Sequence, residues 1–213
     1  MKTLIKYILL AVAMLMYAGC SNHPPSAAQF MNVKENENSL GVGGTVKIGD
    51  LHQGKYRFEN DYSDGEYRGD FDLSYLHRYS HLVVGLYSEN LFSLSALAGF
   101  RTEYIGVQGW LGGAFIAVDE QAPFYGGLRL IEEYPVNWKF RVGLSEHFSR
   151  NAYFVDKNGA GLGSPSTGFY NEFGGGAYLA YKGFSVEMLY GREIDEPRNR
   201  FYLMVNYSFE FDG

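Results

Sequence analysis

Cysteine, long hydrophobic runs and surplus positive charge are all scarce in this sequence of 213 residues. Cys20 is the only cysteine, which excludes an intramolecular disulfide bond and a metal site built from several cysteines. After residue 20, no apolar run approaches the roughly 20 residues that a membrane-spanning helix needs. The formal net charge of −6 disfavours nucleic acid as a partner. The composition therefore argues against a helical membrane protein and against a nucleic-acid-binding protein.

Aromatic residues and glycine, in contrast, are abundant. Tyrosine occurs 18 times, phenylalanine 16 times and glycine 27 times, and each is more frequent than in ordinary domains. Membrane β-barrels carry aromatic residues in two girdles at the membrane interfaces. Glycines allow strands and side chains to pack closely inside a narrow barrel. The composition thus favours a barrel that crosses a membrane with strands.

The N-terminus has the layout of a secretory signal peptide. Lys2 and Lys6 flank the start, an apolar run extends from Ile8 to Met16, and small residues lead to Cys20. The run is shorter than the roughly 20 residues of a membrane anchor. We therefore expect residues 1–19 to be a signal peptide.

The end of this segment, "YAGC" at residues 17–20, resembles the bacterial lipobox. The resemblance implies that Cys20 is acylated and becomes the first mature residue, although Tyr17 stands where the family usually has an aliphatic residue. Ser21 in place of Asp implies passage to the outer membrane, with the lipid anchor on its periplasmic side. An alternative is cleavage after "SAA" at residues 26–28, which would remove the cysteine.

Residues 20–38 lack hydrophobic periodicity and are polar and rich in Pro and Asn. Such a composition predicts a flexible tether. His23 in this segment is expected to be a solvated linker residue rather than a ligand.

From Ser39 onward, apolar and polar residues alternate with the period of two that is typical of strands. The alternation predicts ten strands over residues 40–48, 65–75, 82–88, 94–100, 104–118, 124–134, 138–148, 169–181, 184–190 and 201–211. Eight strands are the alternative, because the segments around 82–102 could merge. Short connections alternate with mostly longer ones rich in Gly, Asp, Asn and Pro, as in outer-membrane barrels. The predicted fold is all-β: residues 39–213 form an antiparallel up-and-down transmembrane β-barrel.

A membrane barrel and a soluble, lipocalin-like lipoprotein differ in which face of these strands is exposed to water. A lipocalin would have an apolar interior and a charged outside, whereas a membrane barrel reverses this arrangement. The charged residues of these strands have mixed signs, which permits pairing inside a lumen. In several strands, glycines lie on the same face as these charges. Both features favour the membrane barrel. We therefore predict lumen charges at Glu66, Arg68, Asp70, Asp72, Lys139, Arg141, Glu187 and Glu210.

The last predicted strand resembles the C-terminal signal of bacterial outer-membrane barrels. Its alternating apolar residues end at Phe211, and only Asp212 and Gly213 follow. The resemblance implies recognition by the barrel-assembly machinery and identifies no specific family. The expected partners are this machinery and outer-membrane lipid; no external ligand can be assigned.

The candidate catalytic residues lie in one cluster. Ser145, His147 and Ser149 share a strand face, and Glu172 lies near the start of the next predicted strand. A histidine between a carboxylate and a hydroxyl is typical of nucleophilic hydrolysis. The segment loosely resembles the His-x-Ser-Asn motif of outer-membrane lipid A deacylases, with one residue inserted before Asn151.

In the deacylases this site faces the lipid, whereas the alternation of the strand places His147 in the lumen. The sequence therefore favours a structural or surface-interaction barrel with a lumen filled by side chains, and not an enzyme. A small porin-like channel, a deacylase-like hydrolase and a lipocalin-like lipoprotein remain alternatives. No cofactor and no metal ion are expected.

Overall fold

The computed structural model describes residues 23–51, 66–90, 93–114, 124–137, 139–155 and 166–212. They form one short helix and ten strands. The elements are α2 (Ala27–Asn32), β1 (Glu37–Gly49), β2 (Glu66–Tyr79), β3 (Leu82–Glu89), β4 (Ser93–Arg101), β5 (Ile105–Ala114), β6 (Phe124–Pro135), β7 (Phe140–Val155), β8 (Ser166–Tyr181), β9 (Phe184–Glu193) and β10 (Asn199–Asp212).

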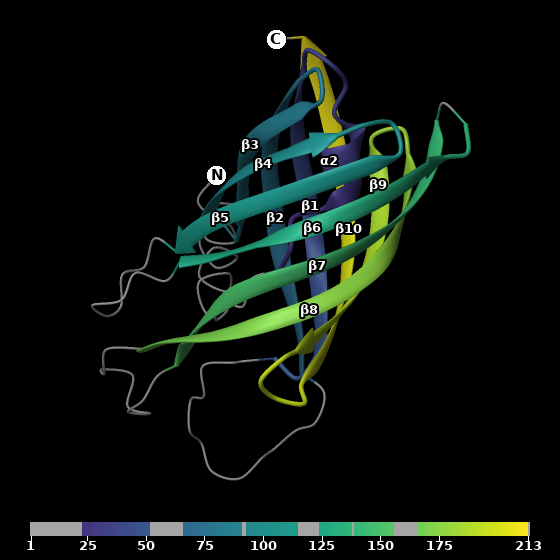
Figure 1. Ribbon diagram of the computed structural model, residues 1–213. Coiled ribbons are helices and arrows are strands. Elements are labelled where there is room, and N and C mark those ends of the chain that lie inside the picture. The colour runs from purple at the N-terminus through teal and green to yellow at the C-terminus, as the bar shows by residue number, and fades with distance from the viewer. Residues whose placement is uncertain are drawn as a thin grey trace, which may run out of the picture.

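The strands close into one antiparallel barrel (Figure 1). Each strand pairs with its neighbours along the chain, and β1 pairs with β10. The predicted fold class and the ten strands are confirmed, and the alternative of eight strands is wrong. β3 and β4 remain separate because the chain reverses after Glu89, where Asn90 adopts a left-handed backbone with φ 53°.

Four short connections lie at one end of the barrel, which we call the turn end. They are residues 80–81, 102–104, 136–139 and 182–183. Ser80 and Lys182 take positive φ values of 51° and 55°, as two-residue hairpin turns require. Glu37 pairs with Asp212, so β1 begins and β10 ends at the turn end. The opposite end, which carries the short connection 90–92 and the longer ones, is the loop end.

The two faces of the wall differ as the alternation of β2 predicts. Tyr67 is 81% exposed on the outside, whereas Asp70 and Asp72 are 6% and 3% exposed and point inward. The same alternation of exposed apolar and buried polar residues recurs along β4 and β9. The interior is therefore charged and the exterior apolar, which makes the lipocalin-like alternative wrong.

Exposed aromatic residues form two bands on the outer wall. Tyr79, Phe100, Tyr104, Tyr134, Tyr181 and Phe184 lie at the turn end, and Tyr67, Phe124, Phe173, Tyr190 and Phe201 lie toward the loop end. Exposed aliphatic residues such as Leu128, Leu144 and Leu203 lie between them. An apolar belt bounded by two aromatic girdles is the surface that a bilayer requires. The fold is that of a transmembrane β-barrel.

No helix in the described part of the chain is long and apolar enough to cross a membrane. The single helix, α2, is drawn in purple within the barrel (Figure 1). Its residues Ala27 to Met31 are buried, and its chain continues through residues 33–36 into β1.

Candidate functional site

The lumen is occupied by residues 23–33 of the chain itself, a segment that we call the plug. Its residues from His23 to Met31 are all buried, as is Val33. The prediction of a flexible tether over residues 20–38, with a solvated His23, is thus wrong for this segment. The plug folds because the barrel supplies apolar and charged partners that the local sequence lacks.

Apolar contacts hold the middle of the plug. Phe30 and Met31, both 0% exposed, belong to a cluster with Ala27, Ala28, Val33 and wall residues of β2, β3, β4, β6 and β8. The wall residues of this cluster are Leu76, Val83, Leu97, Ile131, Tyr178 and Ala180. Full burial of a large apolar side chain contributes about 1.5–3 kcal/mol. This cluster is larger than the two other buried apolar clusters in the described part of the barrel.

Two glycines of the wall make room for these side chains. A Cβ atom at Gly99 of β4 would lie 2.7 Å from Cζ of Phe30, and one at Gly106 of β5 would lie 2.6 Å from Sδ of Met31. Side chains at these inward positions would therefore overlap the plug.

The start of α2 is fixed to a buried ion pair. One carboxylate oxygen of Glu187, Oε2, accepts hydrogen bonds from Ser26 Oγ and from the backbone N–H of Ala27, each at 3.1 Å. The other oxygen pairs with the guanidinium of Arg129, which also donates to the Pro25 carbonyl at 2.7 Å and to Ser145 Oγ at 2.7 Å. Glu187 and Arg129 therefore connect β9, β6 and the plug.

His23 at the other end of the plug lies against two carboxylates. Its Nε2 is 3.3 Å from Asp72 Oδ1 and 3.9 Å from Glu89 Oε2. Lys47 Nζ lies 2.5 Å from Glu89 and 2.7 Å from Asp70, so the two signs of charge are interleaved. The rings of Tyr87 and Tyr202 also face the imidazole.

This environment keeps His23 protonated at neutral pH. Burial alone would lower its pKa, but the charges of Glu89 and Asp72 outweigh the effect of burial and of the nearby Lys47. Together they raise the pKa of His23 to about 9. The plug therefore presents a cation to the acidic wall of β2 and β3.

Three arginines hold the last turn of the plug at the turn end. Arg101 and Arg141 both donate to the carbonyl of Met31, the latter at 3.0 Å. Arg101 and Arg78 donate to the carbonyl of Val33 at 3.1 and 3.4 Å. Carbonyl groups at a helix C-terminus lack partners within the helix, and here the arginines of β2, β4 and β7 satisfy them.

The structure brings two of the candidate catalytic residues together. His147 Nε2 is 3.2 Å from Glu172 Oε1, and Glu172 also accepts hydrogen bonds from Tyr202 at 2.8 Å and Arg200 at 3.2 Å. Ser149 instead accepts a hydrogen bond from Asn151 at 3.0 Å. No described contact joins Ser149 to His147.

All three candidates are at most 2% exposed. A substrate therefore has no path to the hydroxyl in this arrangement. The geometry is that of a buried polar network that joins β7, β8 and β10.

The predicted lumen charges fall into two groups. Asp70, Asp72 and Glu187 are deeply buried inside, whereas Arg68, Arg141 and Glu210 lie nearer the barrel ends and are partly exposed. Lys139 lies in the turn between β6 and β7 rather than on a strand. The side chain of Glu66 lies outside the described residues.

Several inward charges were not singled out from the sequence: Lys47, Glu89, Arg101, Arg129, Glu133, Glu193 and Arg200. Their parity could have revealed most of them, because Arg129 and Glu133 are four residues apart on one strand. For the plug, the only signal was Ser26 followed by the apolar "AAQFM". Cys20 lies outside the described residues, so its acylation stays a prediction.

Comparison with known proteins finds similar solved structures but assigns the chain to no family. No family model matches the chain, and no curated protein matches it. Among solved structures, Neisserial surface protein A is 10% identical with a TM-score of 0.45, covering 83% of this chain and 98% of that one.

Two further solved structures are similar at the same level. The N-terminal β-barrel domain of Pseudomonas aeruginosa OprF is 11% identical with a TM-score of 0.37, covering 82% and 98%. The monoaromatic hydrocarbon channel CymD is 11% identical with a TM-score of 0.33, covering 92% and 95%.

Proposed function

We propose that this protein is an outer-membrane β-barrel of structural or surface-interaction type, whose own N-terminal plug keeps the lumen closed. The observation that carries the proposal is the plug itself. Its residues are buried along the lumen from His23, beside Glu89 near the loop end, to Val33 at the turn end. Ten strands enclose a narrow lumen, and a buried helix within it leaves little room for solutes.

Location in the outer membrane is supported by the wall. Its outward face is apolar between two aromatic girdles, and its inward charges are paired across strands, as in Lys47 with Asp70 and Arg200 with Glu193. Buried charges persist when they are paired and hydrogen-bonded. Such a wall is suited to lipid outside and to a rigid, filled interior.

Single-channel recording tests the closed lumen. The intact protein in planar bilayers should show no steady ionic current, whereas Phe30→Asp should conduct, because a carboxylate cannot stay in the apolar cluster of the plug. The barrel wall does not include Phe30, so heat-modifiable migration on denaturing gels should be kept in both forms. A steady current through the intact protein would overturn the proposal.

A gated channel is the second candidate, and one observation favours it. The polar contacts of the plug at Glu187, Arg129 and Arg101 are reversible hydrogen bonds and ion pairs that do not belong to the strand ladder. Brief openings of the intact protein that become longer in Glu187→Gln would indicate gating, whereas closure under all conditions supports the structural role.

A further inference from the structure

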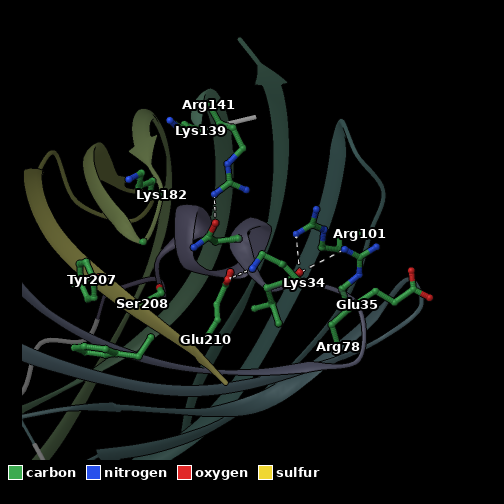
Figure 2. Close-up of a pocket in the computed structure, with 14 residues that line it drawn as sticks. Lys34, Glu35, Arg78, Arg101, Lys139, Arg141, Lys182, Tyr207, Ser208 and Glu210 are labelled. Carbon is green, nitrogen blue, oxygen red and sulfur yellow. Dashed lines mark hydrogen bonds and ion pairs between the residues drawn. The ribbon is translucent and has the colours of Figure 1, made fainter. Parts of the chain in front are cut away.

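A cavity of about 850 Å³ opens at the turn end of the barrel, next to the last residues of the plug (Figure 2). Six cationic side chains line it: Lys34, Arg78, Arg101, Lys139, Arg141 and Lys182. Glu35 and Glu210 are the only carboxylates among its lining residues. We call this cavity the basic vestibule.

The carboxylates near the basic vestibule offset only part of its positive charge. Lys34 pairs with Glu210 and lies 3.6 Å from Glu37, and Arg141 lies 3.5 Å from Glu133. Each of these cations has an anionic partner. Figure 2 shows the contact between Lys34 and Glu210 beneath the turn of the plug.

Arg78, Arg101 and Lys182 form no ion pair with any described residue. The two arginines donate to main-chain carbonyls, at Val33, Met31, Thr102 and Ser80. Lys182 lies 5.6 Å from the centre of the Tyr181 ring, a contact that also leaves its charge uncompensated. A carbonyl group is neutral, so these hydrogen bonds leave the positive charge in place. The buried Glu133, already paired with Arg141, offsets part of the charge of Arg101.

Two of these guanidinium groups are close neighbours, because Arg78 and Arg101 both contact the Val33 carbonyl oxygen. Like charges so close repel each other unless a counter-ion lies between or beside them. Guanidinium groups match the oxygen geometry of phosphate, and ammonium groups bind phosphate as point charges. Both kinds of donor face the same cavity (Figure 2).

We propose that the basic vestibule binds a small multivalent phosphate anion that approaches from the turn end. Arg78 and Arg101 contact one phosphate group, and Lys182, on the other side of the cavity, contacts a second. The anion is either a free oligophosphate or a lipid headgroup that carries two phosphates. This site is independent of whether the plug seals or gates the lumen.

Calorimetry with inorganic pyrophosphate tests the site in the intact protein, solubilised in a non-ionic detergent. Saturable binding of one anion per barrel is expected, and its affinity should fall when salt screens the charges. Arg78→Gln and Lys182→Gln should each weaken binding about tenfold, the value of one lost charged hydrogen bond. Arg192→Gln, an outward-facing change at the loop end of β9, is the matched control and should leave affinity unchanged.

Short-chain cardiolipin, a lipid whose headgroup carries two phosphates, is a competitor that distinguishes the two sources of the anion. Displacement of pyrophosphate by this lipid below its micellar concentration identifies a headgroup, and no displacement identifies a free anion; both results support the site. The proposal fails if pyrophosphate gives no saturable heat. It also fails if the control variant weakens binding as much as Arg78→Gln while all variants keep heat-modifiable migration.

Discussion

Replacing Glu187 with glutamine should both destabilise the protein and loosen its plug. The wild-type carboxylate pairs with Arg129 and accepts hydrogen bonds from Ser26 and Ala27. Glutamine is neutral and keeps only one acceptor oxygen, so Arg129 remains buried without its ion pair. Loss of one partner of a buried pair costs about 3–5 kcal/mol. Because glutamine can still accept one hydrogen bond, we expect the free energy of unfolding to fall by an amount near the lower of these values.

Urea unfolding of the protein in lipid vesicles, followed by tryptophan fluorescence, measures this loss. Ser185→Ala is a matched control on the same strand, because the buried Ser185 hydroxyl has no hydrogen-bond partner among the described residues. Its removal should change the free energy of unfolding by less than about 1 kcal/mol.

The double variant Glu187→Gln with Arg129→Met tests the mechanism. It removes both charges, so it should cost clearly less than the sum of the two single variants, with a coupling of roughly 2 kcal/mol. The explanation would be refuted by additive single effects, or by a Glu187→Gln variant as stable as the Ser185→Ala control.

Three further predictions concern the plug, the wall and the N-terminus. The pKa of His23 is raised, so its ion pairing with Asp72 and Glu89 should stabilise the docked plug fully below about pH 6.5 and be lost as the pH rises through about 9; amide exchange of residues 27–31, corrected for intrinsic rates, should show this dependence in the wild type and lose it in His23→Gln. A cysteine at Phe71, in a Cys20→Ala background, should react with a lipid-phase probe and resist an aqueous maleimide; ready aqueous labelling would contradict the outward, lipid-facing position. Cys20→Ala should abolish metabolic palmitate labelling, and unchanged labelling would show that another residue is the acceptor.

The barrel could be predicted from the sequence because its signal is local and repeated. In β2, apolar outward and polar inward residues alternate from Tyr67 to Tyr75, before the inward apolar Leu76. Each outward residue of this stretch needs only its neighbours to be recognised. The pairing of His147 with Glu172 could also be predicted from the sequence. Adjacent strands in a meander bring Ser149 opposite Glu172, and Gly174 lies opposite His147 and leaves it space.

The plug could not be predicted in the same way. Its apolar stretch from Ala27 to Met31 is too short for a periodic signal, and Pro, Asn and Glu around it are typical of a linker. Its burial depends on Leu97, Arg129, Tyr178 and Glu187, residues far along the chain that meet only when the barrel closes. Segments whose partners are all distant in sequence carry little local information about their structure.

The plug and β1 run in opposite directions, with the reversal at residues 34–36 beside the turn end. The plug and β1 therefore form a hairpin, with β1 in the wall and the plug in the lumen. The plug can leave the lumen through the turn end while the pairing of β1 with β10 stays intact. The barrier to release of the plug is thus the breakage of its side-chain contacts with the wall, and not the separation of β1 from β10.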